Sequence, residues 1–157
     1  MKVKSGYTLI EILVAISIIG VLFSFGFVSY RDFSRRQALS GLVKQIQGDL
    51  RLAQGDAAAG YKPSGCLGTL DSYSFYISSN SVYKVQANCG ATTTDVKSVT
   101  LPSGATMSTN SIPSLLKFKV LGQGTNLSGG VDWIMNLQQA GTGVSASIMV
   151  TSGGEIK

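Results

Sequence analysis

The chain has 157 residues, of which 44% are hydrophobic and 13% are charged, and its formal net charge is +5. This length fits one domain with an appendage. Because the sequence contains no histidine and only two cysteines, it excludes a histidine-based catalytic triad and predicts neither a zinc site nor any other cofactor.

An apolar run starts close to the N-terminus, in the stretch GYTLIEILVAISIIGVLF at residues 6–23. Residues 12–30 are free of charge, and the segment counted from Tyr7 reaches the about 20 residues that a helix needs to cross a membrane. Glu11 is the acidic residue beside this run. The run fits three interpretations: a secretory signal peptide that ends near residues 24–26, an ordinary signal anchor, and a helix that is retained after a short leader is removed.

The leader MKVKSG is basic, only six residues long, and ends in a glycine before the apolar run begins. A cut after Gly6 leaves the whole run on the mature chain, with Tyr7 as its first residue and Glu11 as its fifth. KSG followed by YTLIEILVAISIIGVL resembles the class III signal of type IV prepilins and type II secretion pseudopilins, over about the first thirty residues. Tyr7 stands where that family usually has phenylalanine.

The resemblance implies that a membrane prepilin peptidase cleaves after Gly6 and methylates the new amine of Tyr7. A glycine at the cut allows close approach to the backbone, and Lys2 and Lys4 favour a cytoplasmic leader. The implied partners are this peptidase, other pilins or pseudopilins, an inner-membrane assembly platform with its ATPase, and membrane lipid before assembly. The globular part then lies outside the cytoplasm, first on the inner membrane and later in a pilus or pseudopilus.

Glu11 has two interpretations. In pilin-like filaments this glutamate is thought to pair with the terminal amine of a neighbouring subunit, which makes it an assembly residue. An unpaired carboxylate in an apolar bundle is heavily penalised, whereas a hydrogen-bonded ion pair is tolerated, so the pair would fix the register of subunits. The alternative is that Glu11 lies among lipid headgroups at the end of the helix.

The helix is expected to continue to residue 60, because no proline interrupts residues 7–60. Its second half carries an apolar stripe with i, i+3, i+4 spacing, which predicts packing against a downstream sheet. The stripe consists of Leu39, Leu42, Val43, Ile46, Leu50, Ala53 and Ala57. Gly41, Gly48 and Gly55 fall on the opposite face, which indicates either close approach by a neighbouring helix, tolerance of local melting, or a neutral exposed surface.

The remaining residues 61–157 are rich in turn formers and short β-type runs. A hairpin is predicted from residues 72–77 and 82–87, and further strands at residues 98–101, 115–121, 131–137 and 144–151. Alternating side chains in these runs predict a half-buried sheet. The glycine-rich stretch GQGTNLSGG at residues 122–130 is expected to be a plain turn, because it lacks the lysine and the helix of a phosphate-binding loop.

Cys66 and Cys89 are the two cysteines. If this part of the chain lies outside the cytoplasm, the pair fits a disulfide. Two buried thiols are the alternative.

We therefore expect an α+β fold with a long N-terminal helix, transmembrane in its first half and amphipathic in its second, packed on a C-terminal antiparallel β-sheet domain. The expected parts are a leader (1–6), a transmembrane and assembly helix (7–30), an amphipathic continuation (31–60) and a β-rich domain (61–157). The expected function is that of a structural subunit rather than an enzyme, a minor pilin of a type IV pilus or a minor pseudopilin of a type II secretion system.

The segments LVKQIQGDLRLAQGDAAAG and VSASIMVTSGGEIK add a weaker resemblance to the H-type minor pseudopilins and the FimT-like pilins. The alternative function is therefore a FimT-like minor pilin that binds extracellular DNA for natural transformation. Residues 61–157 contain no arginine, so phosphate contacts would fall to lysines. The candidates are Lys84, Lys97, Lys117, Lys119 and Lys157.

Overall fold

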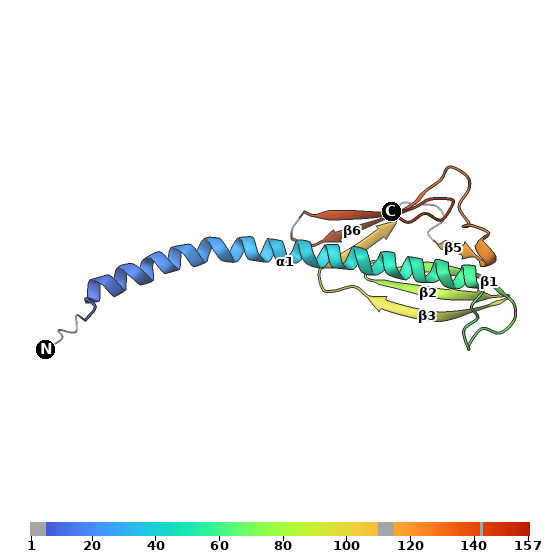
Figure 1. Cartoon of the computed structure of the whole chain (residues 1–157), viewed down its shortest axis with the longest axis horizontal. Coiled ribbons are helices and arrows are strands. Elements are labelled where there is room, and N and C mark those ends of the chain that lie inside the picture. The colour runs from blue at the N-terminus through green and yellow to red at the C-terminus, as the bar shows by residue number, and fades with distance from the viewer. Residues whose placement is uncertain (1–5, 110–114, 142) are drawn as a thin grey trace. The chain divides into compact units, whose positions relative to one another are not determined.

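The computed structural model describes residues 6–109, 115–141 and 143–157, without the side chains of residues 24–29. Lys2 and Lys4 of the predicted leader lie outside the described residues. The chain divides into two compact units, Met1–Arg35 and Arg36–Lys157, and helix α1 (Leu9–Ala59) contributes to both (Figure 1). The unbroken helix predicted over residues 7–60 is confirmed.

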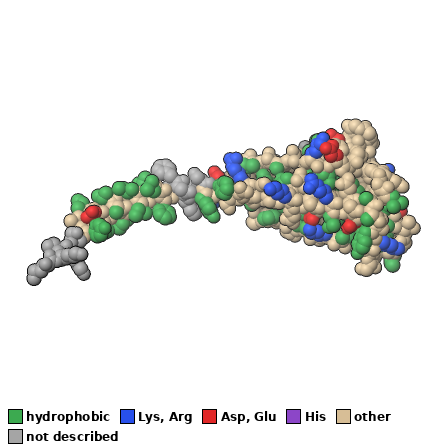
Figure 2. Space-filling model, viewed as in Figure 1, with side chains coloured by type: hydrophobic (Ala, Val, Ile, Leu, Met, Phe, Trp, Pro, Cys, Tyr) green, Lys and Arg blue, Asp and Glu red, His purple; other side chains and the backbone are tan. Residues whose placement is uncertain are grey.

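Within the first unit, α1 exposes large apolar side chains on every side. The exposed fraction ranges from 48% at Ile12 to 83% at Leu9. Figure 2 shows hydrophobic side chains over most of the visible surface of this part of the helix. A helix that is apolar all round normally has its side chains covered by protein or by lipid, and within this unit nothing in the described part of the chain covers them.

Across the described ranges, we find no helix with a stretch that is both long enough and apolar enough to cross a membrane. The transmembrane helix predicted over residues 7–30 is therefore not confirmed.

The second unit consists of the C-terminal part of α1 and two antiparallel sheets (Figure 1). The first sheet has the order β3-β2-β1-β5, and the second has the order β4-β6-β7. The strands of the first sheet are β1 (Leu70–Ser79), β2 (Val82–Cys89), β3 (Thr92–Thr100) and β5 (Leu116–Lys119). Those of the second are β4 (Ala105–Thr109), β6 (Trp133–Gln139) and β7 (Ser145–Val150). This confirms the predicted α+β class.

The core lies where α1 and the inner faces of both sheets meet. The apolar stripe of α1 is buried as predicted, with Ile46 and Leu50 fully inaccessible and Val43 half-buried. Phe75 of β1 makes an edge contact with Trp133 of β6, with ring centroids 5.8 Å apart. This aromatic contact joins the two sheets.

The predicted hairpin is confirmed as β1 and β2, which pair antiparallel and are both longer than expected. Strand β4 was not predicted, and β3 begins six residues before its predicted start. The strand predicted over residues 115–121 ends at Lys119, where a short 3-10 turn η1 (Val120–Gly122) follows. Leu121 in this turn has a φ of 56°, which is incompatible with a strand.

Candidate functional site

The start of α1 is the candidate site, because Gly6, Tyr7 and Glu11 all lie there. Thr8 immediately precedes the helix, and its carbonyl oxygen accepts hydrogen bonds from the backbone N–H groups of Glu11 (3.1 Å) and Ile12 (3.3 Å). The N–H of Glu11 also donates to Thr8 Oγ1 at 3.4 Å. Thr8 is thus the N-cap of α1.

Sequence reasoning overlooked Thr8. The signal was present, because Thr-x-x-Glu in front of an apolar run is the capping-box pattern. The structure contains one half of this box, in which the Thr8 hydroxyl accepts from the N–H of Glu11. Glu11 lies in the first turn of α1, where the positive end of the helix dipole favours a negative charge.

The carboxylate of Glu11 is exposed, and in the described part of the chain it has no ion-pair partner. Its immediate neighbours are apolar and exposed, including Tyr7 at 81% and Ile10 at 70%. The arrangement is a single acid on an apolar surface. Such a surface can associate with another apolar surface only if the carboxylate keeps water or gains a cationic partner.

Cys66 and Cys89 form a disulfide, with Cα atoms 5.6 Å apart. The sequence left two buried thiols as the alternative, and the structure contains the disulfide instead. Cys66 lies in the loop after α1, and Cys89 is the last residue of β2. The hydroxyl of Thr94 in β3 donates to Gly65 O at 2.8 Å. The bond and this contact together fasten the loop after the helix to the first sheet.

A polar contact also joins α1 itself to the first sheet, and the sequence analysis did not predict it. Asp49 is 6% exposed. Its Oδ2 accepts from the hydroxyl of Tyr83 at 2.7 Å, and its Oδ1 accepts from Lys97 Nζ at 2.7 Å. Burial, reinforced by the hydrogen bond to Asp49, raises the pKa of Tyr83 far above its ordinary value. Asp49 is thus a structural link between helix and sheet, and both of its carboxylate oxygens accept hydrogen bonds.

Three of the five lysines expected to serve a DNA-binding alternative are paired with carboxylates of the same chain. Lys97 pairs with Asp49. Lys84 pairs with Asp95 at 2.6 Å, and Lys157 pairs with Glu155 at 3.0 Å. The hydrogen bond from Lys84, followed by that from Gln86, lowers the pKa of Asp95. Within the described residues, Lys117 and Lys119 are the two of the five that form no ion pair.

Residues 1–27 match the family model described as the prokaryotic N-terminal methylation motif. The match covers Gly6, Tyr7, Thr8 and Glu11, and it supports a type IV pilin-like protein with a class III signal. The motif indicates a structural subunit rather than an enzyme. Comparison with curated proteins and with solved structures found no match to this chain.

Proposed function

We propose that the protein is a structural subunit of a type IV pilin-like filament, either a minor pilin or a minor pseudopilin. Prepilin peptidase cleaves the precursor after Gly6 and methylates the amine of Tyr7. The mature subunit enters the filament through the N-terminal part of α1. The finding that carries this proposal is the match of residues 1–27 to the methylation motif.

The exposed surface of α1 supports the proposal from an independent direction. Apolar side chains that are about half to four-fifths exposed between Leu9 and Phe23 need a partner surface. Burying one such side chain contributes about 1.5–3 kcal/mol. Helices of sister subunits provide this burial without any change in the fold of the β-rich unit.

Glu11 gives the assembly its register. The carboxylate would be left without water when apolar helices associate, at a cost of several kcal/mol unless it meets a positive charge. The methylated amine of Tyr7 on a neighbouring subunit is such a charge. Thr8 supports the pair by capping the helix at the turn that carries Glu11.

Before assembly, the subunit is held at the inner membrane by its apolar N-terminal segment, with the β-rich unit outside the cytoplasm. Its partners are the peptidase, the other subunits of the filament and the inner-membrane platform that extracts subunits. The Cys66–Cys89 disulfide supports a location outside the cytoplasm, because disulfides persist in oxidising compartments.

Within the pilin-like proteins, we place this chain with the H-type minor pseudopilins and the FimT-like pilins. The support is the resemblance of LVKQIQGDLRLAQGDAAAG, which forms the C-terminal part of α1, and of the closing segment VSASIMVTSGGEIK. DNA binding is not the function we favour, because the ion pairs of Lys84, Lys97 and Lys157 occupy most of the candidate phosphate ligands.

Substitution of Glu11 tests the assembly role. Glu11→Ala should be inserted and processed like the wild type, yet be absent from filaments sheared from cells. Asp32→Ala is the matched control, because it removes an exposed carboxylate from the same helix outside the apolar segment. Immunoblots of the membrane and filament fractions give the readout, and mass analysis of the membrane fraction checks the processing.

The proposal requires that the filament fraction loses Glu11→Ala and keeps Asp32→Ala. If Glu11→Ala enters filaments at the wild-type level, Glu11 has no role in register. If both variants fail, the loss reflects the helix in general and does not support a specific pair.

A further inference from the structure

The outer face of the second sheet carries a row of three neutral polar side chains. Thr106 of β4 lies opposite Gln138 of β6, and Gln138 lies opposite Ser145 of β7. All three are exposed, and they alternate with residues that are buried in β4 and β6 and half-buried beside Ser145 in β7. None of the three side chains has a hydrogen-bond partner within the ranges that the structure describes.

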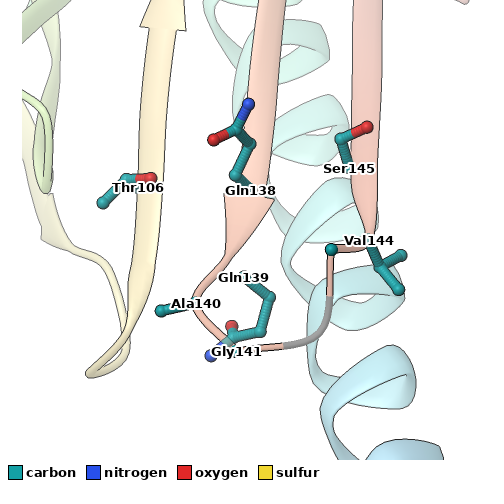
Figure 3. Close-up of a pocket in the computed structure, with 8 residues that line it drawn as sticks. Thr106, Gln138, Gln139, Ala140, Gly141, Val144 and Ser145 are labelled. Carbon is teal, nitrogen blue, oxygen red and sulfur yellow. The ribbon is translucent and has the colours of Figure 1, made fainter.

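This row borders a hollow of about 400 Å³ at the turn between β6 and β7. Gln139, Ala140 and Val144 line it as well, together with two glycines of the turn. The close-up in Figure 3 shows the side chains of Thr106, Gln138 and Ser145 on their three strands. Ligand pockets typically have volumes of about 300–1,000 Å³, so the hollow can take a small molecule or one unit of a polymer.

The chemistry of the wall selects a neutral, hydroxyl-rich ligand. An amide and two hydroxyl groups offer both donors and acceptors, and none of the described residues that line the hollow is charged or aromatic. Sugar hydroxyls also donate and accept. A charged ligand would find no opposite charge here, and a flat apolar ligand would find no stacking surface.

A peptide is a poorer fit for the same surface. Peptides are bound along open sheet edges, in apolar grooves or on aromatic surfaces. This site lies on the face of the sheet, and at Met149 the edge of β7 is covered by Lys157, since the two residues exchange backbone hydrogen bonds of 3.1 and 2.9 Å.

We propose that the row Thr106–Gln138–Ser145 and the adjoining hollow bind a neutral glycan. The inference is independent of the filament role, because it depends only on the β-rich unit. It gives the subunit a surface for recognising uncharged polysaccharide.

The test uses the full-length protein in a zwitterionic detergent without a sugar headgroup. Neutral hexasaccharides of glucose, of mannose and of N-acetylglucosamine are titrated by saturation-transfer NMR, with heparin as an anionic probe. We expect saturable binding of at least one neutral sugar. Its affinity should not change when the salt concentration is raised tenfold, because no phosphate or sulfate contact releases counterions.

A pair of serines in β7 provides the matched control. Ser145 and Ser147 are both exposed on the same face of the same strand, but only Ser145 borders the hollow. Ser145→Ala, Gln138→Met and Thr106→Val should each weaken the sugar affinity about threefold to tenfold. Ser147→Ala should leave it unchanged. The sites are exposed, so none of these variants should unfold the protein.

Three outcomes overturn the proposal. The first is the absence of saturable binding of every neutral sugar up to about 10 mM, which is weaker than any useful recognition. The second is an equal effect of Ser145→Ala and Ser147→Ala, which places any binding elsewhere. The third is binding of heparin alone with a steep salt dependence, which identifies an anion-binding surface instead.

Discussion

The hydroxyl of Tyr83 donates a 2.7 Å hydrogen bond to Oδ2 of Asp49, which connects β2 to a carboxylate that α1 buries against the first sheet. Lys97 of β3 donates to the other oxygen of the same carboxylate. One acidic residue of the helix thus holds two neighbouring strands. A buried carboxylate needs such partners, and its removal leaves them unsatisfied.

Asp49→Ala should therefore lower the free energy of unfolding by about 1–3 kcal/mol, because the Tyr83 hydroxyl and the Lys97 ammonium both lose their acceptor. Asp95→Ala is the control, since it removes a lysine-paired aspartate with a side chain that is 45% exposed. That change should cost only about 0–1 kcal/mol. Urea unfolding followed by circular dichroism gives both values. Equal losses for the two variants would contradict the structural role of Asp49.

Alkaline pH should destabilise the β-rich unit through its buried tyrosines. Burial, with the negative charge of Asp56 adding to it, raises the pKa of Tyr73 to about 12. In the unfolded chain the phenol has a pKa of about 10. The folded protein keeps the proton that the unfolded chain loses, so this contribution is complete below about pH 10 and is lost as the pH rises through about 12.

The measurement compares urea midpoints at about pH 9 and about pH 11, between which the Tyr73 contribution starts to fall. Tyr73→Phe removes the titrating group and should show a smaller drop than the wild type. It also loses the 2.8 Å hydrogen bond from Tyr73 to Tyr61 O, so the two proteins are compared by their pH dependence and not by their absolute stability. An identical drop would exclude Tyr73 as a cause.

Reduction of the Cys66–Cys89 disulfide should lower the free energy of unfolding by about 3 kcal/mol, the value expected in the chain-entropy model for a short closed loop. The two cysteines are 23 residues apart in sequence. Urea unfolding with and without dithiothreitol measures the loss. The double variant Cys66→Ser, Cys89→Ser should be insensitive to the reductant, and an equal response in the double variant would show that the reductant acts elsewhere.

Two glycines should respond to alanine with opposite signs. Gly48 lies in α1, and a Cβ added at this position would meet only open space, so Gly48→Ala should stabilise the subunit by about 0.5–1 kcal/mol. Gly154 has a φ of 89°, and a Cβ there would lie 2.8 Å from Nε2 of Gln54. Gly154→Ala should destabilise it.

Urea unfolding of both variants measures the two changes in the free energy of unfolding. The result for Gly48→Ala also separates the interpretations of the glycine face of α1. A variant that is more stable in isolation yet enters filaments poorly indicates that a neighbouring helix approaches Gly48 closely. Normal entry indicates a neutral exposed surface.

Periodic features of the sequence predicted much of this fold. The burial of Ile46 and Leu50 follows from the 3.6-residue spacing of the stripe, and the hairpin follows from two β-type runs around a turn. Asp49 was missed because an acid next to a glycine resembles a solvent-facing position. Its burial depends on Tyr83 and Lys97, which are distant in the sequence and meet it only after the sheet has formed.

The two candidate sites also differ in how far their residues lie apart in the sequence. The N-terminal candidate site is local in sequence, so the resemblance of the first thirty residues to the class III signal was enough to propose Gly6, Tyr7 and Glu11. The hollow beside Gln138 depends on the register of three strands, and β4 itself was not predicted because its sequence ATMST is short and mostly polar. No pattern within one strand could have placed Thr106 next to Gln138.

Intact-mass analysis of the protein extracted from the cells that make it tests the central claim most directly. The filament-subunit account predicts the mass of residues 7–157 with the two cysteines oxidised and one methyl group on the amine of Tyr7. Fragmentation should place that methyl group on the first residue. A chain that retains Met1, or one that begins beyond residue 20, would contradict cleavage after Gly6 and with it the assembly role of the N-terminal helix.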